Sequence, residues 1–238
     1  MNHIIKTTMF KRESTILNNI LEKHPISVTA LKNNAYVAGG AIRSLFTSSP
    51  INDYDLFFEK ESDFNNTLKG LTDFKFLSTD TAMTHNDSKT KQIFQLICAT
   101  YADPENMLDT FDFTICMAAW KQTGEFIFND RFLQHCSQKR LCFNTNAKFP
   151  ICSLWRALKY IKRGYKLPAI DLIKIALCIN NVDLKNRKEL KRQLMGIDTM
   201  FLKKLTDALD KDGELSYDFG EALEMLNNLF EDAMKDED

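Results

Sequence analysis

The sequence predicts an α+β fold, in which a small mixed β-sheet flanked by helices is followed by an all-helical C-terminal region. Short segments rich in β-branched and aromatic residues recur up to about residue 130. Beyond that point the apolar residues repeat at helical spacing. No internal repeat or low-complexity linker interrupts the chain. We therefore expect a mixed head domain over residues 1–145 and a helical, neck-like domain over residues 146–238.

The composition is that of an ordinary globular protein. The chain has 238 residues, of which 44% are hydrophobic and 26% are charged, and its net charge is −1. Apolar runs are all shorter than the ~18 residues that a membrane-spanning helix requires, and the N-terminus lacks the apolar core of a secretory signal. Six cysteines without a C-x-x-C pair indicate reduced, mostly buried thiols. These features predict a cytoplasmic protein without a membrane partner.

Local periodicity predicts the elements along the chain. Apolar residues at helical spacing predict a first helix over residues 10–23, and Pro25 follows its end. Further helices are expected at residues 62–71, 104–108, 151–164, 169–178, 188–209 and 220–234. Strands are expected at residues 74–77, 79–86, 91–99, 111–120 and 125–128.

The rest of the chain is organised around residues 35–59, AYVAGGAIRSLFTSSPINDYDLFFE. They predict a strand, a tight turn at Gly39 and Gly40, a short helix, a loop and a second strand. Asp53 and Asp55 begin the second strand, where residues i and i+2 point to the same face. Two like charges held that close repel each other unless a cation lies between them, and Mg²⁺ prefers carboxylate oxygens together with substrate phosphates. The stretch therefore predicts a cation site.

The two glycines add a candidate phosphate site. Glycine lets a backbone approach phosphates closely, and the helix that follows offers its N-terminal N–H groups to an anion. The alternative is structural: Gly39 and Gly40 form a plain turn, and Asp53 and Asp55 are the polar start of a strand.

Asp112 is an acidic residue inside the strand expected at residues 111–120. Phe111 and Phe113 would share the apolar face of that strand and leave Asp112 on the other face. Burial of an ionised carboxylate costs several kcal/mol unless the group is paired or bound to a metal. Beside the pair of aspartates, Asp112 would complete a three-carboxylate cluster suited to two-metal phosphoryl chemistry. The alternative is an ion pair with Arg43 or another basic group.

Charge is unevenly distributed in the second half of the chain. Residues 131–170 contain nine Lys or Arg and no Asp or Glu, whereas residues 207–238 contain twelve acids and two lysines. Arg156, Lys159 and Arg163 share one face of the helix expected at residues 151–164. The basic block predicts phosphate contacts, and its alternative is a solvated face that balances the acidic tail.

Three motifs resemble the bacterial-type branch of CCA-adding enzymes and poly(A) polymerases, within the DNA polymerase beta superfamily of nucleotidyltransferases. Residues 39–43 (GGAIR) and 52–56 (NDYDL) resemble the family's G-G-x-x-R…D-x-D signature. Residues 111–115 (FDFTI) resemble its R-R-D-F-T-I-N segment. Residues 150–165 are similar to its P-x-R-x-L-R-A-x-R-F-A-x-R-L-G-F helix. The motifs occur in the family's order, which identifies residues 35–166 as a nucleotidyltransferase head.

The resemblance implies transfer of a nucleoside monophosphate from a nucleoside triphosphate (NTP) to a hydroxyl, with release of pyrophosphate. The first expected acceptor is an RNA (tRNA-like) 3′ end, and the alternatives are a protein or a small molecule. It implies that Mg²⁺, or Mn²⁺ in its place, binds the catalytic residues Asp53, Asp55 and Asp112. It also implies that the NTP contacts Gly39, Gly40, Arg43, Ser44, Arg156 and Lys159. Lys162 and Arg163 would contact RNA phosphates.

Two positions depart from the family pattern. Ser44 stands where the family has an Asp, and Thr110-Phe111 replaces the two arginines tied to ribose recognition. A convincing E-D-x-x-R segment, which reads the incoming base in the family, is also missing from the sequence. These departures favour a second hypothesis, a relative that binds nucleotide, RNA or a protein partner without turnover.

Overall fold

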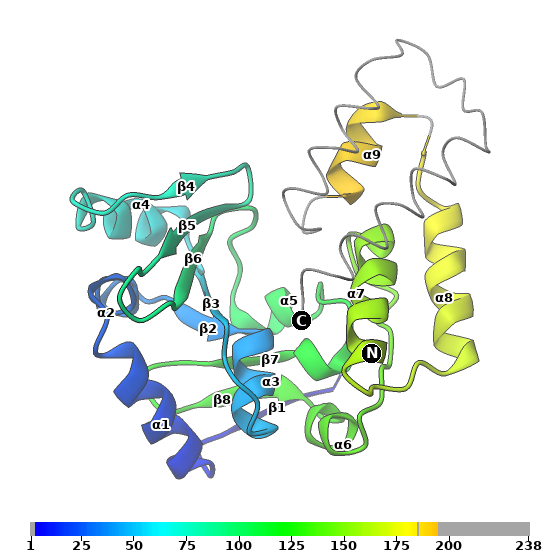
Figure 1. The fold of residues 1–238 in the computed structure, drawn as a ribbon, viewed down its shortest axis with the longest axis horizontal. Helices are drawn as coiled ribbons and strands as arrows, with labels where there is room; N and C mark the ends of the chain where they lie inside the picture. The colour runs from blue at the N-terminus through cyan, green and yellow to red at the C-terminus, as the bar shows by residue number, and fades with distance from the viewer. Residues whose placement is uncertain (1–2, 185, 195–238) are drawn as a thin grey trace.

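The computed structural model describes residues 3–184 and 186–194, and its centre is one eight-stranded sheet (Figure 1). The strands lie in the order β1-β8-β7-β2-β3-β6-β5-β4. Their bounds are Ile4–Thr7 (β1), Tyr36–Ala38 (β2), Asp53–Phe57 (β3), Leu77–Ser78 (β4), Ala82–Asn86 (β5), Ile93–Ile97 (β6), Ala118–Trp120 (β7) and Phe126–Asn129 (β8). β3 and β6 are parallel, and the other described pairs are antiparallel. The predicted α+β class is confirmed.

Helices cover both faces of the sheet and then continue beyond it. Their bounds are Lys11–Leu21 (α1), Pro25–Lys32 (α2), Gly40–Phe46 (α3), Glu61–Lys69 (α4), Pro104–Leu108 (α5), Phe132–Ser137 (α6), Pro150–Lys162 (α7), Ala169–Asn180 (α8) and Arg187–Gln193 (α9). The larger buried cluster joins one face of the sheet to α1, α2 and α3. A smaller cluster on the other face includes Met107 and Leu108 of α5. In Figure 1, α7 and α8 lie beside the sheet, on the side of α3.

The register of β2 and β3 places the glycine turn next to the paired carboxylates. Ala38, the last residue of β2, lies opposite Asp55 of the antiparallel strand β3. The end of β2 and the start of β3 therefore lie side by side at one end of these two central strands, which is called the edge of the sheet below. Gly39 follows Ala38 directly, so the turn and both aspartates reach the same edge.

Most of the strongly periodic segments are confirmed. The helix predicted at residues 10–23 is α1, and the one at 151–164 is α7. The strand predicted at residues 91–99 is β6. Pro25 follows the end of α1, as predicted, and it also begins α2, where its fixed φ suits the first helical turn. The short elements β1 and α6 were not predicted, because four to six residues give too little periodicity to distinguish them from loops.

The strand predicted over residues 111–120 is wrong for most of its length. Only Ala118–Trp120 (β7) belongs to the sheet, and Thr114–Cys116 forms a 3₁₀ turn. The Asp112 carboxylate accepts a hydrogen bond from the Phe113 backbone N–H at 2.9 Å, and Phe113 forms an isolated bridge with Phe143. These contacts engage the backbone away from the sheet. Asp112 therefore lies in a loop, and β7 pairs with β2 and β8 rather than with β3.

Other predictions concern the end of the chain, the cysteines and membranes. The helix expected at residues 188–209 corresponds to α9 in its first part, and its remainder and the helix expected at 220–234 lie outside the described residues. All six cysteines lie in the described part as free thiols, three of them buried. Among the described residues, no helix has the length and apolar character needed to cross a membrane.

Candidate active site

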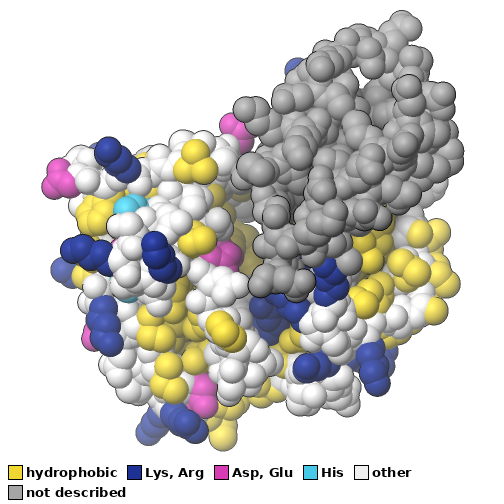
Figure 2. Space-filling view, viewed as in Figure 1, with side chains coloured by type: hydrophobic (Ala, Val, Ile, Leu, Met, Phe, Trp, Pro, Cys, Tyr) yellow, Lys and Arg dark blue, Asp and Glu magenta, His cyan; other side chains and the backbone are white. Residues whose placement is uncertain are grey.

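A cavity of about 1470 Å³ opens between the edge of the sheet and α7. Its lining includes these residues predicted as site residues: Gly39, Gly40, Arg43, Ser44, Asp53, Asp55, Asp112, Arg156, Lys159 and Arg163. Lys162 is exposed and is not one of the described residues that line it. Figure 2 shows acidic side chains on the sheet side and basic side chains on the α7 side near the middle of the molecule. The fold thus brings two oppositely charged walls to one cavity.

Strand alternation directs the paired carboxylates into this cavity. Tyr54 and Leu56 are buried in the larger cluster, so Asp53 and Asp55 point to the opposite face of β3. Asp55 Oδ1 is buried and has no hydrogen-bond partner among the described residues. Burial, and then repulsion from Asp53, raises the pKa of the Asp55 carboxyl to about 7, against its ordinary 3.8, while the Arg156 charge opposes this shift. A buried acceptor without a donor beside a second carboxylate suits a hard cation.

Asp112 reaches the cavity with its charge already balanced. Its side chain is 11% exposed, and Oδ2 lies 2.6 Å from Arg156 Nε. Oδ1 accepts the Phe113 backbone N–H described above. The Asp112 charge holds the pKa of the Arg156 guanidinium well above its usual range. The described part of the chain contains no group of three His, Cys, Asp or Glu side chains arranged to hold a metal, so the three-carboxylate cluster stays a prediction.

The glycine turn has a conformation that favours glycine. Gly39 has φ +84°, in the left-handed region, and its N–H donates to the Ala118 carbonyl at 2.9 Å. A Cβ on Gly39 would lie 3.5 Å from Cε2 of Phe111 and 4.0 Å from Oδ2 of Asp55. The chain therefore turns close to the Phe111 ring and the Asp55 carboxylate, where glycine adds no side chain.

Two arginines converge on one tyrosine hydroxyl at the back of the cavity. Arg43 Nη1 donates to the Tyr160 hydroxyl at 2.6 Å, and Arg156 Nη2 donates to it at 3.4 Å. Cys116 Sγ lies 3.0 Å from the same hydroxyl oxygen. The buried Ser44 hydroxyl accepts from Arg43 Nη2 at 3.4 Å, so Ser44 supports the arginine from behind. The hydrogen bond from Arg43 to Tyr160 thus joins α3 to α7.

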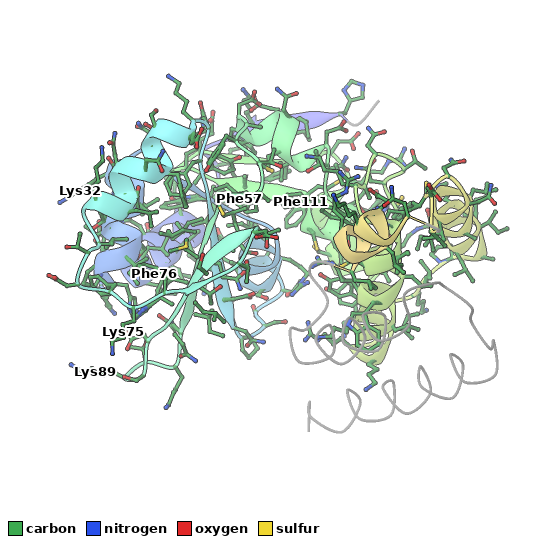
Figure 3. The ribbon with its side chains drawn as sticks, turned by 90° about the horizontal axis from the view of Figure 1, so that it is seen from above. Lys32, Phe57, Lys75, Phe76, Lys89 and Phe111 are labelled. Carbon is green, nitrogen blue, oxygen red and sulfur yellow. The ribbon has the colours of Figure 1, made fainter. Side chains whose placement is uncertain are left out.

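Several cavity residues were not predicted as site residues. Lys139 and Lys148 add to the basic wall, and the acid-free run over residues 131–170 was the signal for them. Phe57 and Phe111, with ring centroids 5.7 Å apart, form an aromatic surface beside the carboxylates (Figure 3). Cys116 gave no signal in the sequence, because its role depends on a contact with a residue 44 positions away.

Comparison with known sequences connects the chain to one protein family and to a phage protein of the same name. A sequence model described as the Gabija anti-defense 2 family matches residues 8–139. The protein "Gabija anti-defense 2" of Bacillus phage SPbetaL7 is 32% identical over 227 residues, which cover 88% of this chain and 57% of the relative. The chain therefore spans somewhat more than half the length of this curated relative.

Comparison with solved structures connects the fold to CCA-adding enzymes. The Thermotoga maritima CCA-adding enzyme complexed with tRNA aligns with a TM-score of 0.54 at 14% identity, over 88% of this chain and 55% of that one. A CCA-adding enzyme in complex with ATP aligns with a TM-score of 0.58 at 16% identity, over 82% of this chain and 51% of that one. The chain has the nucleotidyltransferase fold.

Proposed function

This chain belongs to the Gabija anti-defense 2 family, and we propose that its cavity transfers a nucleoside monophosphate from an NTP to an acceptor hydroxyl as its route to anti-defence activity. The observation that carries the proposal is the Asp53–Asp55 pair, which lines the same cavity as the basic wall. The buried Oδ1 of Asp55 has no hydrogen-bond partner among the described residues. The narrower likeness to CCA-adding enzymes and poly(A) polymerases is part of the proposal. We also propose that the protein acts in the cytoplasm, which supplies NTPs and Mg²⁺.

The carboxylates fit a divalent cation. Asp53 and Asp55 supply hard oxygen ligands, and the unpartnered Oδ1 of Asp55 leaves one of these oxygens ready for coordination. Mg²⁺, or Mn²⁺ in its place, would neutralise charge on the phosphates and lower the pKa of the acceptor hydroxyl. Asp112 joins this set as the predicted third carboxylate if it exchanges Arg156 for the ion.

The basic wall suits the triphosphate. Arg43 and Arg156 are arginines at the cavity, and guanidinium groups bind phosphate oxygens in pairs of parallel hydrogen bonds. Gly39 and Gly40 carry no side chain beside Asp55 and Arg43, so the phosphates can approach the backbone there. In the transfer, the acceptor oxygen forms a bond to the α-phosphorus, and the bond from that phosphorus to the β-bridging oxygen breaks. Pyrophosphate leaves with the electron pair, and the hydroxyl proton passes to water.

An RNA 3′ end is the acceptor that the charge of the cavity supports best. Lys139, Lys148, Lys159 and Arg163 line the α6–α7 side of the cavity, and a strand of phosphates would neutralise them. In support, the solved neighbours of this fold include a CCA-adding enzyme complexed with tRNA. If RNA is the acceptor, its affinity falls steeply with salt, whereas an affinity independent of salt removes RNA as the partner.

The Asp112–Arg156 ion pair favours a second candidate, a nucleotide- or RNA-binding relative without turnover. In this reading Arg156 replaces a metal as the permanent counter-ion of Asp112. A protein or small-molecule hydroxyl remains the alternative acceptor, since the family is named for its action against a defence system.

One labelling experiment separates these candidates. The protein is incubated with each α-labelled NTP, Mg²⁺ and either total RNA, host protein or small metabolites. Transfer that is lost in Asp53→Asn and retained in Asp73→Asn, an exposed carboxylate outside the cavity, supports the enzyme. NTP binding without label on any acceptor overturns it and leaves the binding protein. The labelled fraction identifies the acceptor class.

A further inference from the structure

We infer that the Tyr160 hydroxyl is a positioning group that sets Arg43 and Arg156 as a guanidinium pair for two neighbouring phosphates of one ligand. The inference deepens the proposed function, on which it rests for the identity of the ligand. It assigns a role to a residue that was not predicted as a site residue. The ligand class that it implies is a di- or triphosphate rather than a monophosphate.

The hydrogen-bond capacity of the hydroxyl is fully used. A tyrosine hydroxyl accepts two hydrogen bonds and donates one. Arg43 at 2.6 Å and Arg156 at 3.4 Å fill the two acceptor positions. Cys116 Sγ at 3.0 Å is placed to accept the remaining proton. The oxygen therefore fixes the spacing between two side chains that come from α3 and α7.

The tyrosine ring reinforces this arrangement. The guanidinium carbons of Arg43 and Arg156 lie 5.0 Å and 5.9 Å from the centre of the Tyr160 ring. Both distances are within the range at which a cation is attracted to an aromatic ring. Burial raises the pKa of the Tyr160 hydroxyl far above its ordinary value, so the group stays neutral and continues to accept from both arginines.

The charge around the hydroxyl is not balanced. Arg156 is paired with Asp112, but Arg43 has no carboxylate partner within the described part of the chain. The two positive charges also repel each other, because both guanidinium groups donate to the same hydroxyl oxygen. Two cations held together by a neutral hydroxyl are therefore one anion short. A ligand with two adjacent phosphates supplies that charge and reaches both groups, whereas a single phosphate leaves one guanidinium without it.

The test uses inorganic phosphates, so that it does not depend on the base. Titration calorimetry with Mg²⁺ compares tripolyphosphate, pyrophosphate and orthophosphate. Tyr160→Phe keeps the ring and removes the hydroxyl, and we expect tripolyphosphate and pyrophosphate to bind about 10-fold more weakly. Orthophosphate affinity is expected to change less than about 2-fold, because it does not need both arginines.

The matched control is Tyr36→Phe. It also removes a tyrosine hydroxyl hydrogen bond, from Tyr36 to the Ala102 carbonyl at 2.8 Å, but outside the cavity. Its tripolyphosphate affinity should equal that of the unmodified protein. Equal losses in both variants, or an unchanged affinity in Tyr160→Phe, would overturn the inference.

Cys116 provides a second route if Tyr160→Phe does not fold. Cys116→Ala removes the third partner of the hydroxyl, together with a contact from Arg156 Nη2 to Cys116 Sγ at 3.5 Å, and we expect a 2- to 3-fold loss of tripolyphosphate affinity. Cys116→Ser restores an acceptor and should restore the affinity, a recovery that a packing defect would not show. A loss in Cys116→Ala that Cys116→Ser fails to restore counts against the inference.

These results are separable from the fate of the proposed function. Phosphate binding that depends on Tyr160, in a protein that transfers no label, retains the inference and removes the enzyme. Label transfer in a protein whose phosphate binding does not change in Tyr160→Phe retains the enzyme and removes the inference.

Discussion

The two walls of the cavity are built in different ways. The sheet wall comes from one continuous stretch, residues 35–59, in which the antiparallel register of β2 and β3 brings the glycine turn next to the paired aspartates. The helix wall is assembled from separate segments, and its central arginine, Arg156, is held by Asp112 from a loop and by Tyr160 from its own helix. Short-range sequence order determines the first wall, and long-range contacts determine the second.

The walls also differ in how their charge is compensated. Asp55 has a buried oxygen without a partner among the described residues. In Asp112, Oδ1 accepts the Phe113 backbone N–H and Oδ2 forms an ion pair with Arg156. Two aspartates of one cavity therefore differ in whether the protein supplies a positive partner for the carboxylate. The Asp55 oxygen would gain a positive partner only from a bound ion, whereas Asp112 already has Arg156 as its positive partner.

The largest expected effect is at Asp55. Asp55→Asn should lower the rate of label transfer by at least about 1000-fold, because it removes a metal ligand from the reacting centre. Mg²⁺ should raise the melting temperature of the unmodified protein, because it binds the native state, and Asp55→Asn should abolish this rise. The rate is measured by transfer of labelled NTP and the rise by thermal unfolding, with Asp73→Asn as the control. Retained transfer in Asp55→Asn would contradict the metal assignment.

The Asp112→Asn variant tests whether Asp112, unlike Asp55, is neutralised by the protein and not by a metal ion. Asp112→Asn leaves the Arg156 guanidinium without its counter-ion, and the loss of unfolding free energy should be about 2 kcal/mol, since the arginine is 39% exposed and partly screened. Urea unfolding measures this change. The Mg²⁺-dependent rise in melting temperature should survive. Its disappearance would show instead that Asp112 binds the ion, as the sequence predicted.

The sequence predicts the sheet wall well because its signals are local. A glycine turn before a D-x-D strand specifies which side chains share an edge, and the register of β2 and β3 places them there. The prediction fails at Asp112, since alternating Phe111 and Phe113 favour a strand that the loop contact with Phe143 prevents. Nothing in the order of residues indicates that Arg43 and Tyr160, 117 positions apart, share a hydrogen bond. Long-range polar contacts of this kind follow only from the packed fold.

The pH dependence of stability should separate the two carboxylates further. A carboxyl whose pKa is raised on folding binds its proton more tightly in the native state, so the unfolding free energy falls as pH rises. For Asp55 the decline should begin near its ordinary pKa of 3.8 and end above about 7. Urea unfolding with EDTA should show this decline, and Asp55→Asn should flatten it and be the more stable protein at pH 8. Bound Mg²⁺ should oppose the decline, because it stabilises the ionised form.

The control for this pH series is Asp73→Asn, in which the decline should persist. An unchanged pH profile in Asp55→Asn would mean that the carboxyl is solvated and that its environment resembles that of an exposed acid.

The smallest expected effect concerns the outer part of the helix wall. Lys148 lies at the cavity, and its Nζ donates to Thr100 Oγ1 at 3.3 Å. The exposed Lys89 lies in the turn between β5 and β6, at a distance from α7 (Figure 3). Lys148→Ala should weaken RNA binding about 3-fold and reduce the slope of log affinity against log salt by about 1, because one phosphate contact is lost. Lys89→Ala has the same change of charge and should leave both quantities unchanged. Filter binding over a salt series measures them. Equal effects of Lys148→Ala and Lys89→Ala would mean that the overall charge of the protein attracts RNA. The cavity would then not be the acceptor site.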